Sequence, residues 1–468
     1  MNTYQRNITI ALLIATFLSA IEVTIVSTAM PVIVNKLGGM DLISWVFAVY
    51  LLTSAVTTPI FGKLSDLFGR KMIFMVGVSL FLLGSALCGF SQTMEQLIWF
   101  RALQGIGAGA LMPTTFTIIG DIFDYEQRAK VQGLFSAIWG IAGIFGPLVG
   151  GFFVDYLTWH WIFFINIPFG LVSMLLLGRS LKESSEKKER IIDYSGALTF
   201  TIGMTALLYA LLSGGNEIPW NSKAMYFLFG VALVFLALFI RIQLRHPEPM
   251  VPLGLFKYRD LAVSNLVSFF MSAILIGLTA YLPLWIQGVL EMGATSSGLT
   301  LTPMSLGWPI GAVLSGRLLV RLGARSISLL GTVLVAIGSL ALALVTAATA
   351  NWVLVVIMFF VGLGFGLSFT VFTVVVQSAV GWNMRGAATS SNTFLRILGQ
   401  TLGIAVLGTV LNQHIGAYSA SGEQVPPDIL AGGLHMVFVI LAGIAIVSAL
   451  FTGLIPKHKP QDEKKQAS

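Results

Sequence analysis

The chain has 468 residues, of which 56% are hydrophobic and 10% charged, and its mean hydropathy is +0.88. Because a soluble domain carries about 25% charged residues, this composition excludes a soluble protein and predicts a polytopic membrane protein. The net charge of +7 does not indicate nucleic-acid binding, since the basic residues stand in short segments between apolar runs, where they orient a membrane protein.

Apolar windows of about 20 residues, long enough to cross a bilayer as helices, follow one another along the chain. The predicted spans are residues 8–31, 42–61, 72–91, 96–119, 131–153, 162–181, 195–213, 224–243, 261–286, 297–316, 326–348, 352–379, 386–411 and 432–455. The predicted fold class is therefore an all-α integral membrane protein with fourteen transmembrane helices. The charged tail, residues 457–468, is predicted to be disordered.

The basic residues predict the orientation. If the N-terminus is inside, all 27 Lys and Arg residues lie on the cytoplasmic side except Lys36, Lys223, Arg101 and Arg396. Short cytoplasmic loops are enriched in Lys and Arg, so we expect both termini in the cytoplasm of a bacterial cell. The first 30 residues imitate a signal peptide, but Glu22 interrupts them and many spans follow, which predicts an uncleaved first helix in the cell membrane.

One carboxylate lies within the first predicted span. Glu22 is the only ionisable residue between Arg6 and Lys36, and a charge inside a bilayer costs about 2.5–3.5 kcal/mol. Such a residue usually faces a cavity or a partner. Two interpretations are open: a neutral glutamic acid hydrogen-bonded between helices, or a carboxyl that takes up and releases a proton or a cationic ligand during transport.

Arg101, in the fourth predicted span, is a second intramembrane charge. At 1.5 Å per residue it lies roughly 9 Å below the outer boundary, and Glu22 lies roughly 21 Å from the inner one. In a hydrocarbon core about 30 Å thick the two reach a similar depth. If the two spans are neighbours, the charge of Arg101 and burial act on the proton affinity of Glu22 in opposite directions. A static buried pair is the alternative.

A weak internal repeat connects the two halves of the chain. Residues 62–71 (GKLSDLFGRK) follow the second span, and residues 316–325 (GRLLVRLGAR) repeat their pattern G-[KR]-L-x4-G-x-[KR] after the tenth. Duplicated six-helix halves are a hallmark of secondary transporters. The predicted domains are a six-helix bundle at 1–181, a cytoplasmic linker with two inserted helices at 182–257, and a second six-helix bundle at 258–456.

The first of these repeated segments is a predicted loop with its own chemistry. Gly62 and Gly69 permit tight turning and close helix approach. Asp66, Arg70 and Lys71 can bridge helix ends, and Asp66 can cap the third helix. The alternative is that the two basic residues only enforce the topology.

The fifth span has glycines on one helix face. Gly140, Gly143, Gly146 and Gly150 are spaced i, i+3, i+6 and i+10, and small residues let another helix approach closely. Pro147 removes a backbone donor and favours a bend. This face suits either a conformational hinge, made of the last three glycines and the proline, or packing without gating.

Four stretches together resemble the major facilitator superfamily, in particular its fourteen-helix drug:proton antiporter branch. Residues 62–71 match the superfamily pattern G-x-L-x-D-x-x-G-R-[KR], and residues 97–109 (LIWFRALQGIGAG) are similar to its span-four pattern L-x3-R-x2-Q-G-x-G. Residues 140–151 (GIAGIFGPLVGG) match the span-five signature of exporters, and residues 159–170 (WHWIFFINIPFG) resemble a stretch typical of the fourteen-helix branch.

The resemblance implies roles for these residues. It makes spans one and four neighbours, with Glu22 and Arg101 as the proton-coupling pair, and it makes residues 62–71 a latch that is intact in the outward-facing state. It also implies a cavity lined by spans one, four, nine and twelve. The expected substrate-binding residues are Gln104, Met112, Met271, Ser272, Tyr281 and Phe372.

No catalytic constellation is evident: there is no P-loop, and five histidines and one cysteine form no zinc pattern. The leading interpretation is a proton-coupled multidrug exporter, contributing to antibiotic resistance, that exchanges extracellular protons for amphipathic cytotoxic compounds by alternating access. No cofactor beyond the proton gradient and no nucleic-acid partner are expected, and the chain is expected to act as a monomer in the bilayer.

Three points stay open. One alternative is a transporter of the same fold for a single endogenous peptide, lipid or siderophore, and another is a membrane sensor or scaffold. Between residues 261 and 411 the only acidic residue is Glu291, near the outside. Neutral or zwitterionic drugs are therefore as compatible with the sequence as cationic ones. Arg396 is predicted to reach back to the cytoplasmic side or to pair there, in preference to a substrate role.

Overall fold

The computed structural model describes residues 2–37, 42–181, 192–214, 218–251, 253–292, 294–421 and 426–456. Within these ranges the chain is built from helices, and no sheet strand is found. The first seven helices are α1 (Thr3–Leu37), α2 (Ile43–Phe68), α3 (Arg70–Gly89), α4 (Met94–Ile122), α5 (Tyr125–Tyr156), α6 (Trp161–Phe164) and α7 (Asn166–Ser180). They are followed by α8 (Tyr194–Ser213), α9 (Lys223–Gln243), α10 (Arg259–Leu284), α11 (Ala294–Ala343), α12 (Asn351–Ser378), α13 (Arg385–Ser421) and α14 (Pro427–Thr452).

Twelve helical stretches of the described residues are long and apolar enough to cross a membrane, which confirms an all-α multi-pass membrane protein. In hydrocarbon every backbone N–H and C=O must be paired, and a helix does this within itself. The predicted count of fourteen is not confirmed by these twelve. The helix α11 covers two predicted spans, with Gly323 at φ 77° between them. The helix α5 covers the predicted span 131–153 but is not one of the twelve.

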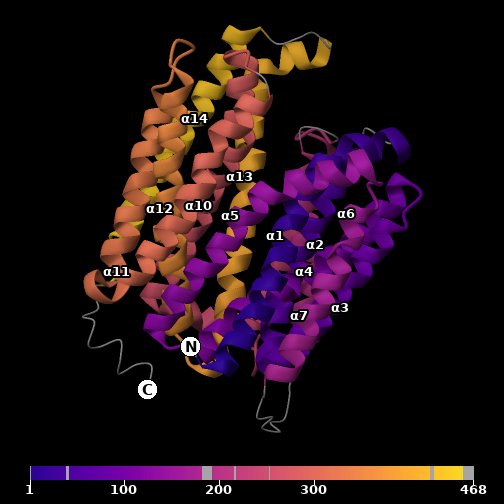
Figure 1. The fold of residues 1–468 in the computed structure, drawn as a ribbon, viewed down its shortest axis with the longest axis vertical. Coiled ribbons are helices and arrows are strands. Elements are labelled where there is room, and N and C mark those ends of the chain that lie inside the picture. The colour runs from indigo at the N-terminus through magenta and orange to yellow at the C-terminus, as the bar shows by residue number, and fades with distance from the viewer. Residues whose placement is uncertain are drawn as a thin grey trace.

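Figure 1 shows two groups of helices, α1–α4 with α6 and α7 in one and α10–α14 in the other. Helix α5 packs against both α1 and α11, and α13 packs against α2. The groups therefore meet at two seams, α5–α11 and α2–α13. Helix α1 begins and α14 ends at the same end of the molecule (Figure 1). We call it the inner end, after the orientation that the basic residues predict.

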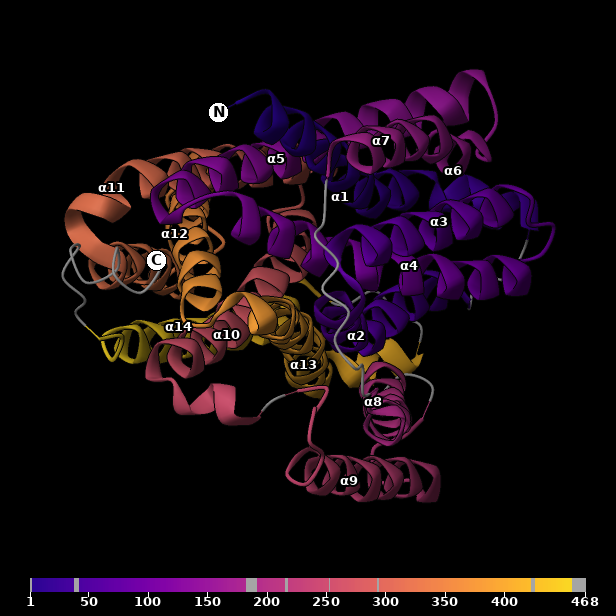
Figure 2. The ribbon, with the colours of Figure 1, turned by 90° about the horizontal axis from the view of Figure 1, so that it is seen from below.

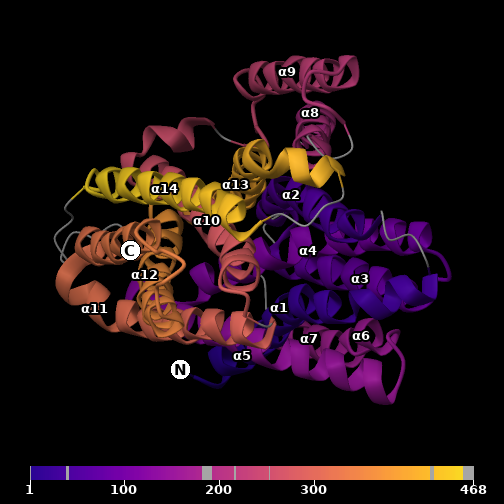
Figure 3. The same ribbon diagram turned by 90° about the horizontal axis from the view of Figure 1, so that it is seen from above.

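Helices α8 and α9 lie beside the α2–α13 seam, with α9 outermost (Figures 2 and 3). Phe200 on α8 contacts Phe239 on α9 and Phe394 on α13, with ring centroids 5.1 and 5.5 Å apart. The apolar side chains of Leu233 and Phe227 on α9 are 72% and 71% exposed, as expected of a helix that faces lipid. The two helices therefore attach to one seam without entering either group.

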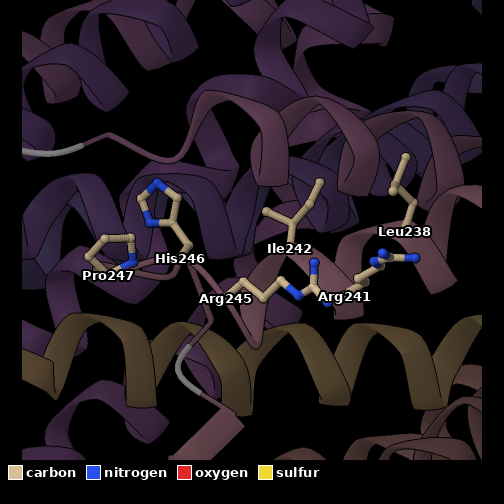
Figure 4. Close-up of a pocket in the computed structure, with 6 residues that line it drawn as sticks. All are labelled: Leu238, Arg241, Ile242, Arg245, His246 and Pro247. Atoms are coloured by element: carbon tan, nitrogen blue, oxygen red, sulfur yellow. The ribbon is translucent and has the colours of Figure 1, made fainter.

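A small surface pocket lies at the inner end of α9 (Figure 4). Its volume is about 320 Å³. It is lined by Leu238, Arg241, Ile242, Arg245, His246 and Pro247. Arg241 and Arg245 form no ion pair with another described residue, and they sit where the positive-inside rule expects cations. Arg241 lies on α9, a helix outside both groups.

Helices α11 and α12 pack through glycines. A Cβ atom added at Gly366 on α12 would lie 2.0 Å from the carbonyl oxygen of Trp308 and 2.8 Å from the backbone nitrogen of Ala312, both on α11. A Cβ at Gly311 would lie 2.2 Å from the carbonyl oxygen of Leu363. Backbone atoms cannot turn away as a side chain can, so these glycines set the distance between the two helices.

Gly366→Val is therefore expected to destabilise the protein, since overpacking a tight contact costs about 1–3 kcal/mol. The melting temperature in detergent and the yield of monodisperse protein report the loss. Gly443→Val on α14 is the matched control, because no atom lies within 4 Å of a Cβ there. Equal losses in the two variants would show that the close approach of α11 and α12 is not the cause.

Candidate functional site: a buried charge cluster and an interbundle network

A cluster of buried polar side chains joins four helices of the first group. Glu22 on α1 and Arg101 on α4 form an ion pair between Oε1 and Nη1. The other oxygen, Oε2, accepts a hydrogen bond from Asn166 Nδ2 at 2.7 Å, and this nitrogen also donates to Ser85 Oγ on α3 at 2.9 Å. We call Glu22, Arg101, Gln104, Asn166 and Ser85 the Glu22 cluster.

Arg101 holds several partners at once. Its Nη1 also donates to Gln104 Oε1 at 2.9 Å, and its Nε donates to the carbonyl oxygen of Val46 at 3.2 Å. Its guanidinium carbon lies 4.3 Å from the ring centroid of Tyr50, a cation–π contact. Glu22 is fully buried and Arg101 is 1% exposed. The two intramembrane charges that the sequence singles out are thus in direct contact.

The glycines of the span-four motif position this cluster. A Cβ at Gly105 would lie 2.5 Å from the carbonyl oxygen of Tyr50, and a Cβ at Gly107 would lie 2.3 Å from the backbone nitrogen of Phe81. Without side chains at these positions α2 and α3 approach α4 closely. The approach of α2 brings Tyr50 against Arg101.

The cluster is suited to a change of protonation. Gln104 Nε2 and Asn166 Oδ1 are buried and have no hydrogen-bond partner among the described residues, so an unused donor and an unused acceptor adjoin the ion pair. Removing one partner of a buried pair costs about 3–5 kcal/mol unless other groups compensate. Because Gln104 Oε1 and the Tyr50 ring also contact the guanidinium, Arg101 keeps partners when Glu22 is neutral.

A second network crosses the α2–α13 seam at the inner end. Asp66, near the end of α2, accepts hydrogen bonds from the backbone nitrogens of Gly386 and Ala387 at 2.9 and 2.8 Å. These nitrogens belong to the first turn of α13, where a carboxylate satisfies free N–H groups and the helix dipole. Asp66 also pairs with Arg70 at 2.6 Å.

Asp121, at the end of α4, extends this network. Its Oδ2 lies 3.1 Å from Arg70 Nε and its Oδ1 lies 3.0 Å from Arg385 Nη1. Arg70 Nη2 also donates to the carbonyl oxygen of Trp382 at 2.9 Å. We call Asp66, Arg70, Asp121 and Arg385 the interbundle network, because it ties α2 and α4 of one group to α13 of the other.

Two expectations for residues 62–71 are wrong. The segment is not a loop: α2 continues to Phe68 and α3 begins at Arg70, so only Gly69 leaves the helical conformation, at φ 95°. Asp66 does not cap α3, because its oxygens accept from α13 instead. Gly62 serves close approach, since a Cβ there would lie 2.3 Å from Cβ of Ser390 on α13. Lys71 lies half-buried in the first turn of α3.

The proposed hinge residues lie in one continuous helix, α5. Gly143 faces α11, where its added Cβ would lie 3.8 Å from Ser305 Oγ. Gly146 and Gly150 are buried, and the side chain of Pro147 lies outside the described residues. The glycine face therefore packs at the seam with α11, and its role as a hinge stays a prediction.

The six expected substrate-binding residues divide between the two groups of helices. Gln104 belongs to the Glu22 cluster, and Met112 lies about two turns further along α4, half-buried. The other four are buried in the second group: Met271, Ser272, Tyr281 and Phe372. All of these except the serine belong to one hydrophobic core cluster. Their contact with substrate stays a prediction.

Sequence reasoning missed four partners in these networks: Ser85, Asn166, Asp121 and Arg385. Asn166 is a polar residue in an apolar span, inside the stretch 159–170 that carries part of the resemblance. A polar residue in an apolar span is the same signal that singled out Glu22, so Asn166 could have been found. Asp121 and Arg385 stand at predicted inner helix ends. Charges are common there, so nothing in the sequence marks these two as partners.

Comparisons with known proteins identify the family of the chain. The sequence profile of the Major Facilitator Superfamily matches residues 12–404. The chain is 39% identical over 405 residues to the multidrug transporter protein MdtP of Bacillus subtilis (strain 168), a match covering 86% of this chain and 75% of that protein. It is 40% identical over 403 residues to multidrug resistance protein 3 of the same organism, covering 86% and 79%.

A solved structure shares the fold. The crystal structure of the human organic anion transporter MFSD10 (TETRAN) superposes with a TM-score of 0.71 at 13% sequence identity, covering 97% of this chain and 100% of that one. At that identity the likeness concerns the fold alone. The profile match and the relatives indicate a membrane transporter and not an enzyme, and the helical membrane fold agrees. The chain belongs to the Major Facilitator Superfamily.

Proposed function

We propose that the chain exports multiple amphipathic drugs in exchange for protons by alternating access. The names of the two Bacillus relatives support multidrug efflux. The observation that carries the proton-coupled part is the fully buried Glu22 in contact with Arg101 and Asn166. An ionisable residue inside a membrane span is costly, and such residues mark ion and proton pathways.

We infer that the described conformation faces outward. The interbundle network joins the two groups at the inner end, and Arg70 and Asp66 within it have only 3% of their side-chain surface exposed. In the proposed cycle a proton from the outer side neutralises Glu22. Arg101 then keeps Gln104 and Tyr50 as partners, and the carboxyl no longer holds α1 to α4 by charge.

Helix α4 links the two networks. Arg101 and Asp121 lie twenty residues apart on it, about 30 Å at 1.5 Å per residue. A tilt of α4 that follows neutralisation of Glu22 therefore acts on the contacts of Asp121 with Arg70 and Arg385. Opening of these contacts exposes the inner side, where loss of the proton from Glu22 accompanies capture of the drug. The energy comes from the proton gradient, with the monomer in a bacterial cell membrane as the working unit.

The test is efflux from an efflux-deficient bacterium that expresses the chain. We expect several-fold protection against a panel of amphipathic compounds, and we expect dye efflux to stop when a protonophore collapses the proton gradient. Efflux that continues with the protonophore would remove proton coupling. Correct membrane expression without protection against any compound would favour a transporter of one dedicated substrate or a scaffold. Substrate-induced proton movement in proteoliposomes then distinguishes the two, because a scaffold shows none.

A further inference from the structure

Arg396 is a membrane-embedded cation that neither network uses. It lies eleven residues from Arg385 on α13, about 17 Å into the helix at 1.5 Å per residue. Its guanidinium carbon lies 4.1 Å from the ring centroid of Phe369 on α12. The side chain is half-buried. Arg396 therefore points to the interior of the second group, and the expectation that it reaches or pairs at the inner side is wrong.

The second group offers Arg396 no counterion at this depth. The sequence has no acidic residue between Glu291 and Glu423, and Asp260 lies in the first turn of α10. Among the described residues Arg396 forms no hydrogen bond or ion pair. Glu22, the acid deep in the first group, is held by Arg101 and Asn166 in this conformation. A cation in a membrane interior normally pairs with an anion, and the chain supplies none here.

Aromatic side chains adjoin this cation. Trp308 on α11 stacks on Phe365 and Phe369 of α12, with ring centroids 5.4 Å apart in both pairs and interplanar angles of 27° and 16°. Phe365 and Phe369 are at most 4% exposed, whereas Trp308, like Arg396, is half-buried. Trp308 and Arg396, both half-buried residues, thus contact Phe369. Flat aromatic ligands favour such stacking surfaces.

We propose that Arg396 binds the carboxylate of an aromatic substrate whose ring lies against the half-buried Trp308. This deepens the proposed function and rests on it, because it names the class of drug: planar aromatic anions or zwitterions. A guanidinium binds a carboxylate with two parallel hydrogen bonds. In the Glu22 cluster the charge of Arg101 is already neutralised by Glu22, whereas the charge of Arg396 is left for a substrate carboxylate. The absence of acidic residues between Glu291 and Glu423 fits anionic substrates and disfavours cationic ones.

The test is binding of a matched pair of compounds, a planar aromatic carboxylic acid and its methyl ester, to the purified full chain in nanodiscs. Arg396→Gln is expected to raise the dissociation constant of the acid about tenfold or more, since hydrogen bonds to charged groups are the strong ones. The ester should change about twofold or less, because it never used the charge. Arg396→Lys should recover part of the affinity for the acid, which separates lost charge from lost folding.

Arg241→Gln is the matched control, since it removes an Arg from the surface of α9 (Figure 4) and should leave both affinities unchanged. Equal losses for acid and ester in Arg396→Gln, or no loss for either, would overturn the proposal. Unchanged affinities with lost proton coupling would instead make Arg396 a partner of Glu22 in another conformation, which also overturns it. If the unmodified chain exports the ester but not the acid, multidrug export stands and this inference fails.

Discussion

Glu22→Gln is expected to reduce drug transport driven by a pH gradient to the level of protein-free liposomes. Glutamine has nearly the same volume and keeps an acceptor for Arg101, but it cannot bind and release a proton. Asn166 Oδ1, which has no partner among the described residues, becomes an acceptor for the new amide when the Asn166 side chain flips. Exchange of labelled for unlabelled drug at equal pH on both sides should persist, because it needs no net proton movement.

The same variant leaves Arg101 buried without its anion. Breaking a buried pair costs about 3–5 kcal/mol when nothing compensates, and Gln104 and Tyr50 offset part of that cost here, so we expect a moderately lower melting temperature for Glu22→Gln alone. The double variant Glu22→Gln/Arg101→Gln removes both charges and should recover most of that stability without recovering gradient-driven transport. Normal gradient-driven transport in either variant would defeat the role assigned to Glu22.

Asp66→Ala is expected to shift the protein away from the conformation in which the inner end is closed. Asp66 accepts two backbone hydrogen bonds from α13 and pairs with Arg70. Hydrogen bonds to charged groups contribute about 1.5–3 kcal/mol, so the population with an open seam should rise about tenfold or more.

A cysteine at Ser390 measures this shift. Ser390 is 1% exposed and lies against Gly62 at the closed seam, so in a Cys88→Ser background Ser390→Cys should react slowly with a membrane-impermeant maleimide added from the inner side. Asp66→Ala should accelerate the reaction about tenfold. Lys63→Ala is the matched control from the same segment, because its 3.7 Å contact with the part-exposed Glu248 contributes only about 0–1 kcal/mol. Equal rates in both variants would show that Asp66 does not hold the seam closed.

The two networks were predictable to different degrees. Glu22 and Arg101 stand out because charges inside apolar spans are rare and costly, and the rise of a helix placed them at similar depth. Asp66 and Arg70 stand out by their motif, but the partner helix of Asp66 begins more than 300 residues later, and any of several inner helix ends fits its chemistry. A local pattern does not say which free N–H groups a carboxylate reaches.

For Arg396 the prediction from the sequence was wrong. Its position in the sequence, a few turns from an inner helix end, favours a side chain that reaches the membrane surface. The direction of the side chain depends on the rotation of α13, which its contacts with α2, α10 and α12 decide. The burial of Met271 and Phe372 in the core also could not be predicted from the sequence, because Met and Phe suit a packed core and a binding cavity equally well.

By itself the sequence determined the all-α membrane fold, the succession of apolar spans and the two charges that pair in the first group. These follow from hydropathy and from the cost of charge in lipid, which act on each segment separately. Only the tertiary structure decided that Asp66 caps α13, that Asn166 completes the Glu22 cluster, and that Arg396 lies against Phe369. Those contacts depend on which helices are neighbours and how each helix is rotated about its axis. Short-range patterns in the sequence do not determine either of these.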